Sequence, residues 1–377
     1  MVEDIGFLHS RARKSLVPML LHSAMSKGDR GLVAALFAIS LLTSCSSGHS
    51  SRNADRICEN DDMCTAATAA AVASWEDDYE PPRVVTEADT IRAEFSLRIA
   101  GVESPYRIMS AFVLPGQSLG IETADAPAKS SFLAKTNGGT IARTGPHSWQ
   151  WTAPSKPGTH RIRVIDRTSG HSADVLAFVL QPYAGEEHVG SYRIGQYERE
   201  PLKGNPAYLP PRGFVQVTAE NVDAKVSPHF KLGQFLCKQN GVFPKYLALQ
   251  TALLVKLEAL MEEMARKGIK AETLHVMSGY RTPHYNSTIG NETSYSRHSY
   301  GDAADVFVDN DGDGNMDDLN RDGRIDNADA KILYELVETV LEPNSPSHMH
   351  GGLAVYKANS AHGPFVHVDT RGSKARW

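Results

Sequence analysis

Short apolar segments that partly alternate with polar positions fill the chain between about residues 83 and 183. Gly, Pro, Ser and Asn, which favour turns, lie between them. The segments are TIRAEFSLRIAG, RIMSAFVLPG, SLGIETA, SWQWTAP, THRIRVIDRTSG and SADVLAFVLQP. Several short strands with turn signals at this spacing predict an antiparallel β-sandwich. An immunoglobulin-like topology is expected from this architecture alone.

Trp149 and Trp151 lie two positions apart in one of these segments. Side chains two apart on a strand face the same side of the sheet. We interpret the pair as core packing, and a carbohydrate-binding platform is the alternative.

The pattern changes twice towards the end of the chain. Residues 184–226 contain many turn formers and predict a β-rich connector. From Tyr246 to Gly268, apolar positions recur at helical spacing and the segment ends on basic residues and a glycine, which predicts a helix. A strand (TLHVMSGY), a second helix (ADAKILYELVETVLEP) and a last strand (HGPFVHVDTRG) follow. We expect a mixed α+β domain over residues 227–377.

An apolar run near the start, residues 31–43, follows two basic residues. It is shorter than the ~20 residues that span a bilayer and has the length of a signal-peptide core. Its end, LTSC, resembles the lipobox of bacterial lipoproteins, which implies cleavage before Cys45 and lipidation of its thiol. An ordinary cleaved signal or an internal apolar helix is the alternative.

Residues 1–24 are interpreted as an over-extended start, because Met25 opens a complete signal by itself. Residues 1–45 then form the signal and lipobox region. Residues 46–82 are rich in Ser, Asp, Asn and Ala and predict a flexible tether. Ser46 after the cysteine resembles outer-membrane sorting, so we expect a lipid-anchored periplasmic protein of the bacterial cell envelope.

The chain has four cysteines. Cys58 and Cys64 are close enough for a short disulfide in an oxidising compartment, with two free thiols as the alternative. Cys237 has no surrounding Cys–His signature and is expected to be a buried structural thiol.

The charge is unevenly distributed. Ten Asp and two Arg between Asp302 and Asp329 give this segment a net charge of −8, while the whole chain carries −5. A block of this kind either stays disordered or is neutralised by a cation. No basic stripe with interleaved aromatic residues is present, which argues against nucleic acid as a partner.

Four ordered motifs carry candidate chemistry. They are SGYRTPHYN (278–286), SRHSYGDAAD (296–305), GGLAVY (351–356) and GPFVHVD (363–369). A catalytic zinc site uses about three N or O ligands and keeps one position open for water. His298, Asp305 and His367 would supply such a set, and the metal would lower the pKa of the bound water.

In this order the motifs resemble the zinc D-alanyl-D-alanine metallopeptidase family. That family includes bacterial zinc DD-carboxypeptidases and vancomycin-resistance dipeptidases, and it is akin in fold to lysostaphin and hedgehog domains. The resemblance covers residues 227–377 and implies that His298, Asp305 and His367 hold zinc. It also implies that Arg281 binds the carboxylate or polarises the carbonyl of the substrate, and that Ser296 contacts a ligand residue or the substrate.

One position departs from the family pattern. Many members have Glu or Asp three residues before the last zinc histidine as the general base, and here that residue is Pro364. The lysostaphin-like arrangement has a histidine two residues before, and here that residue is Phe365. Asp369, two residues after His367, is the base we predict, with orientation of a zinc ligand as its alternative role. The other nearby candidates are His362, His350 and His348.

The acidic block fits a calcium-binding loop of the EF-hand type. The frame that fits best uses Asp318, Asn320, Asp322, the Arg324 carbonyl, Asp326 and Asp329. A second frame from Asp309 overlaps it at residues 318–320, so the two are not independent. We expect a calcium loop over 309–329 that holds the spacing between Asp305 and His367, with a disordered acidic loop as the alternative.

The sequence therefore predicts a multidomain envelope lipoprotein that uses zinc to cleave peptidoglycan peptides, with calcium as a structural ion. Cleavage at a D-Ala-D-Ala end and cleavage at a cross-link both stay open. A non-catalytic peptidoglycan-binding lipoprotein is the first alternative, because Pro364 cannot act as a base. A calcium-dependent adhesion or scaffold protein is the second.

Overall fold

The computed structural model describes residues 91–126, 129–291, 293–341 and 345–377. These residues belong to one compact unit that spans Val72–Trp377. The predicted signal region, the tether, and the cysteines at 45, 58 and 64 lie outside the described residues. Within the described ranges, no helix has both the length and the apolar character needed to cross a membrane.

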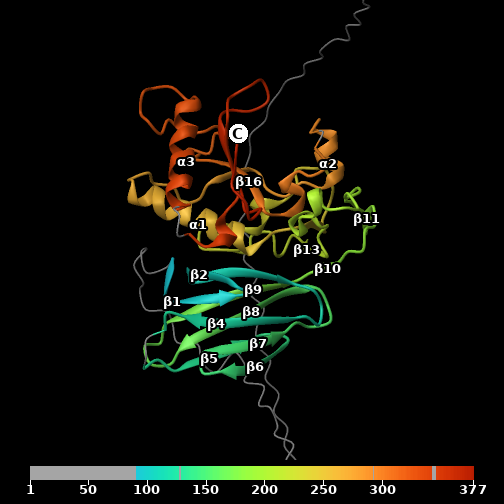
Figure 1. Cartoon of the computed structure of the whole chain (residues 1–377), viewed down its shortest axis with the longest axis vertical. Coiled ribbons are helices and arrows are strands. Elements are labelled where there is room, and N and C mark those ends of the chain that lie inside the picture. The colour runs from blue at the N-terminus through green and yellow to red at the C-terminus, as the bar shows by residue number, and fades with distance from the viewer. Residues whose placement is uncertain (1–90, 127–128, 292, 342–344) are drawn as a thin grey trace, which may run out of the picture. The chain divides into compact units, whose positions relative to one another are not determined.

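The structure is mostly β-sheet with few helices, and its first part forms two sheets (Figure 1). The five-stranded sheet has, in spatial order, β2 (Val102–Tyr106), β1 (Arg92–Ile99), β4 (Ser118–Ala124), β7 (Ser148–Thr152) and β6 (Thr140–Gly145). The four-stranded sheet has β3 (Ile108–Val113), β9 (Ser172–Val179), β8 (Gly158–Asp166) and β5 (Phe132–Thr136). The immunoglobulin-like layout stays a prediction.

One strand pair differs from the antiparallel arrangement that we expected. β3 and β9 run parallel, while the other pairs in these two sheets are antiparallel. Parallel neighbours need a long crossover, and residues 114–171, which contain β4 to β8, provide it.

The two tryptophans belong to the core. Trp149 and Trp151 are buried on β7, and the Trp151 Nε1 donates a hydrogen bond to the Gly138 carbonyl at 2.8 Å. Buried rings present no face to a sugar, so the carbohydrate-platform alternative is wrong.

The predicted connector is only partly strand. β11 (His188–Val189) and β12 (Tyr192–Arg193) form a short hairpin, and 3₁₀ turns η2 (Leu202–Gly204) and η3 (Pro206–Tyr208) follow. β13 (Gly213–Val217) lies between β10 (Gln181–Pro182) and β14 (Lys245–Leu247) in a three-stranded sheet.

The C-terminal part has a five-stranded sheet and three α-helices among its described residues. Its strand order is β15 (His275–Ser278), β16 (Ala303–Phe307), β18 (Phe365–Asp369), β17 (Gly352–Tyr356) and β19 (Ala375–Arg376). The helices are α1 (Thr251–Arg266), α2 (Pro283–Thr288) and α3 (Asn327–Val340), and α3 lies beside α1 and strands β17 and β18 (Figure 1).

The predicted helix boundaries shift for identifiable reasons. α1 begins at Thr251 rather than Tyr246, because Tyr246 and Leu247 pair with β13 as part of β14. α3 begins directly after Asp326, whose side chain accepts a hydrogen bond from the Ala328 N–H and caps the helix. Cys237 is buried, as predicted.

Candidate metal centre and its cavity

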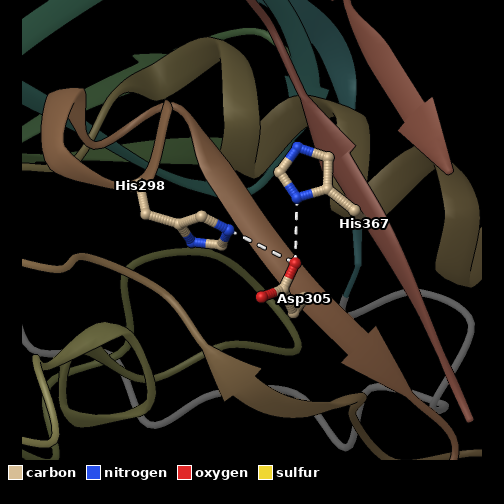
Figure 2. A group of neighbouring side chains, drawn as sticks. All are labelled: His298, Asp305 and His367. Carbon is tan, nitrogen blue, oxygen red and sulfur yellow. Dashed lines mark hydrogen bonds and ion pairs between the residues drawn. The ribbon is translucent and has the colours of Figure 1, made fainter. Parts of the chain in front are cut away.

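The three predicted zinc ligands come from three neighbouring elements and meet at one point (Figure 2). His298 lies in the 3₁₀ turn η5 (Arg297–Tyr300), Asp305 on β16 and His367 on β18. β16 and β18 are antiparallel, and Asp305 is directly opposite His367. Directly opposed residues project to the same face of a sheet, which explains why a carboxylate and an imidazole that are 62 positions apart in sequence are neighbours.

A glycine allows the loop of His298 to return to β16. Gly301 ends η5 in the left-handed region, with φ of +74°. A Cβ at this position would lie 2.4 Å from the backbone carbon of Ala248. Only glycine tolerates both the backbone conformation and this close approach.

One carboxylate oxygen is shared by the two imidazoles. The Asp305 Oδ1 lies 3.3 Å from the His298 Nε2 and 2.9 Å from the His367 Nδ1 (Figure 2). The three ligand atoms lie within 4.8 Å of one another. All three residues are buried.

The remaining nitrogen of each imidazole is held by an acceptor. The His298 Nδ1 lies 2.7 Å from the Gly279 carbonyl, and the His367 Nε2 lies 3.1 Å from the Asp369 Oδ2. An N–H that donates to such a partner leaves the other nitrogen unprotonated and fixes the ring orientation. The other two nitrogens, the His298 Nε2 and the His367 Nδ1, both point towards Asp305.

Electrostatics favours a neutral His298 and an ionised Asp305, whereas it favours a proton on His367. Burial lowers the pKa of His298 and keeps its ring neutral. Burial alone would raise the pKa of Asp305, but His298 and His367 hold it far below its usual range. Burial alone would lower the pKa of His367, but its bonds to Asp305 and Asp369 raise it.

The donor set fits zinc. Two imidazole nitrogens and a carboxylate oxygen are the N and O ligands of catalytic zinc sites, which keep a further position for water or substrate. All three ligand residues line a cavity of about 800 Å³, so this further position is accessible from the cavity.

Asp369 does not line the cavity, and it lies on the far side of His367 from Asp305. This position differs from the one expected of a general base. The Asp369 carboxylate is fully buried and contacts the nitrogen of His367 that faces away from Asp305. It also accepts hydrogen bonds from the Gly352 N–H at 2.7 Å and the Arg371 Nε at 2.9 Å. Burial alone would raise the pKa of Asp369, but His367 and Arg371 hold it far below the usual range. These contacts match its alternative role, orientation of His367.

The predicted substrate residues are at the cavity. The Arg281 Nη2 donates to the Asp305 Oδ2 at 2.5 Å, and its Nε donates to the Ser278 Oγ at 2.6 Å. Arg281 and Ser296 both line the cavity. Arg281 is therefore connected to the metal ligand Asp305 directly, which the sequence did not indicate.

The other base candidates are in different environments. His362 lines the cavity, and its ring packs edge-on against Phe365. Its Nδ1 lies 2.7 Å from the Gly363 carbonyl, and its Nε2 lies 2.8 Å from the Asn359 Nδ2. These partners make Nδ1 the donor and Nε2 the acceptor. His348 and His350 are not among the cavity residues.

Other cavity residues lie outside the metal-ligand motifs, although Trp377 ends the RGSKARW segment that follows the last of these motifs. Trp377 packs against His367, with ring centroids 5.3 Å apart, and its Nε1 donates to the Tyr356 hydroxyl at 2.8 Å. Tyr208 from η3 and Lys238 also line the cavity. They come from segments without metal-ligand spacing, so the sequence offered no signal for them.

A buried ion pair lies next to His298. Arg297 and Asp302 are almost fully buried, and the Arg297 Nε donates to the Asp302 Oδ1 at 3.0 Å. The guanidinium lies 4.3 Å from the centroid of the Tyr208 ring and donates to the Ala207 carbonyl at 3.0 Å. This pair attaches the predicted connector to the loop that carries His298.

The structure does not support the predicted calcium ligands. The Asp329 carboxylate is buried and accepts hydrogen bonds from the backbone N–H groups of Leu319, Asn320 and Asp326. Asp326 caps α3. The acidic group that does come together in the described part of the insert is Asp309, Asp311 and Asp317, from the other frame.

One comparison with known proteins agrees with the part of this site that precedes residue 333. Residues 228–332 match the model of the family described as Peptidase M15, whose members are zinc-dependent. The matched segment contains Arg281, Ser296, His298 and Asp305. The curated proteins contain no match to the chain. The family match and the His–Asp–His group together support an M15-family zinc peptidase domain in the C-terminal part of the chain.

Proposed function

We propose that this protein is an envelope-anchored, zinc-dependent peptidase that hydrolyses peptidoglycan stem peptides. The observation that carries the proposal is the buried His298–Asp305–His367 group at the wall of a large cavity. The scissile bond is a D-Ala-D-Ala bond or a cross-link between stems. In this proposal the lipidated Cys45 anchors the protein at the outer membrane, on the periplasmic side.

The chain's own residues bind and orient the substrate. When zinc is bound by His298, Asp305 and His367, it polarises the scissile carbonyl and lowers the pKa of an attacking water. Arg281 uses some of its five N–H donors for Ser278 and Asp305, and the others remain for a substrate oxygen. His362 is the candidate general base: its Nε2 carries the lone pair in the tautomer that its partners select, and it takes a proton once the Asn359 amide, which donates to that lone pair, gives way to the water.

The test uses the zinc-loaded protein and defined muropeptides, with products identified by mass spectrometry. Loss of one alanine establishes a carboxypeptidase, and cleavage of dimers establishes an endopeptidase. His367→Ala is expected to lose zinc and activity together. His362→Ala is expected to keep zinc and lose about 10²- to 10⁴-fold in kcat, with His350→Ala as its matched control.

A second candidate function is a non-catalytic peptidoglycan-binding protein. Pro364 replaces the acidic residue of the family pattern, and Asp305 is the only carboxylate among the described residues that line the cavity. Binding of muropeptides by the zinc-loaded wild type without any product would favour this function over the peptidase.

A further inference from the structure

The described lining of the metal cavity contains four basic side chains, and one of them has no carboxylate partner. Arg281 pairs with Asp305, Arg297 with Asp302 and Arg371 with Asp369. The ammonium of Lys238 has neither an ion-pair partner nor a hydrogen-bond acceptor among the described residues. Lys238 is an exposed residue at the cavity wall, and a cation without a partner there is available to an anionic ligand.

The backbone around Lys238 is fixed from both sides. Lys238 follows the 3₁₀ turn η4 (Leu232–Phe235), and its neighbours Cys237 and Gln239 are buried. The Gln239 Nε2 donates to the Arg193 carbonyl at 3.0 Å, and its Oε1 accepts from the Thr282 hydroxyl at 2.6 Å. Lys238, which lines the cavity, is therefore attached to a fixed stretch of backbone.

The same segment is hydrogen-bonded to the metal loop. The Tyr280 N–H donates to the Phe235 carbonyl at 2.9 Å, and the adjacent Gly279 carbonyl holds the His298 Nδ1. The Arg281 N–H donates to the His298 carbonyl at 3.2 Å. Lys238, Arg281 and the zinc ligand His298 therefore belong to one connected unit.

The surroundings of Lys238 favour an anion. Burial lowers the pKa of Lys238 and the positive charge of Arg281 lowers it further, while the negative charge of Asp305 partly offsets both. A carboxylate between these two cations would neutralise their repulsion. Lys238 and Tyr285 also line a second cavity of about 510 Å³ that contains Arg193 and His284, so Lys238 lies where the two cavities meet.

We propose that Lys238 binds a carboxylate of the peptide substrate and orients the peptide at the metal centre. This deepens the peptidase function proposed above and rests on it, because that function supplies the peptide. The carboxylate comes either from the C-terminus of the peptide or from an acidic side group along it. Arg281, which is held by Asp305, then acts on the scissile carbonyl.

The test measures equilibrium binding to the zinc-loaded, full-length protein by calorimetry. One ligand pair is an N-acylated peptide ending in D-Ala-D-Ala and its C-terminal amide, both with the last peptide bond replaced by a non-hydrolysable isostere so that the ligand is not cleaved during the titration. A second pair carries Glu or Gln at the position before these alanines, with the C-terminus amidated in both. The proteins are wild type, Lys238→Met, Lys238→Gln, Lys238→Arg and, as the matched control, the exposed Lys267→Met.

We expect wild type to prefer the acid over the amide in one pair by roughly ten- to a hundredfold, as for a hydrogen bond to a charged group. Lys238→Met and Lys238→Gln should lose most of this preference, while Lys238→Arg and Lys267→Met keep it. The ligand pair that shows the preference in wild type and loses it in Lys238→Met identifies the source of the carboxylate. Equal preference in wild type and Lys238→Met, or no preference in wild type, overturns the proposal. Binding with the expected preference but without cleavage of muropeptides would remove the peptidase function and leave this role of Lys238 intact.

Discussion

The two ring nitrogens of His367 have different partners. Nδ1 faces Asp305, and Nε2 contacts Asp369. A carboxylate on the far nitrogen of a histidine ligand increases its basicity and fixes its orientation. At the scale of single residues, Asp369 contacts the nitrogen of His367 that faces away from Asp305, and Asp369 is not among the residues that line the cavity.

Asp369→Asn is expected to lower zinc affinity by about 10- to 100-fold, because the amide can no longer hold the Nε2 proton as a carboxylate does. A chelator competition titration measures this affinity, and thermal unfolding checks that the variant is folded. A variant with unchanged zinc affinity and a large loss of kcat would restore Asp369 as the general base.

The sequence predicted which three residues come together as a candidate metal group, and it left two roles open for Asp369. His298, Asp305 and His367 are recognisable because ordered motifs fix their spacing. Strand alternation correctly places Asp369 on the same face as His367, but it does not determine which ring nitrogen points at it. Lys238 and Tyr208 depend on the packing of distant loops, which no local pattern encodes.

At the scale of elements, the acidic insert between β16 and α3 is held by hydrogen bonds from its own backbone N–H groups to its own carboxylates. Gly323 has a positive φ of +81°, and Asp318 accepts hydrogen bonds from the N–H groups of Asp322 and Gly323. The turn chemistry expected of a calcium loop is therefore present. The carboxylate of Asp329, which calcium would need, is occupied by backbone donors.

Asp329→Ala is expected to lower the free energy of unfolding by about 1–3 kcal/mol, because it leaves buried N–H groups without an acceptor. The effect should persist in a calcium chelator. Urea unfolding with chelator and with added calcium measures it, and the exposed Glu272→Ala, outside the insert, is the control. If the chelator alone destabilised wild type to the level of the variant, the calcium prediction would stand.

At the scale of the whole molecule, the site extends beyond the segment that matches the family. The match begins at residue 228, yet Leu202 and Tyr208 line the metal cavity. The turn-rich pattern of residues 184–226 predicted a connector and gave no indication that it forms a cavity wall. The buried pair of Arg297 and Asp302 makes this possible, because Arg297 contacts Tyr208 and the Ala207 carbonyl.

Arg297→Met is expected to cost about 3–5 kcal/mol of stability, because it leaves the buried carboxylate of Asp302 unpaired. The double variant Arg297→Met/Asp302→Leu should recover much of this loss, since it removes both charges. Urea unfolding of the two variants beside wild type decides the point. A loss below about 1 kcal/mol in the single variant would show that the pair is not needed.

Asp305 has a consequence for how the protein exchanges its metal. One of its oxygens faces both histidines, and the other holds Arg281. A ligand that fixes the Asp305 carboxylate through Arg281 also restricts the orientation of the oxygen that faces the two histidines. Thermodynamic reciprocity then requires that a ligand whose affinity is raised by zinc raises the affinity for zinc by the same factor. Where zinc is scarce, a larger fraction of the ligand-bound protein than of the free protein would therefore hold zinc.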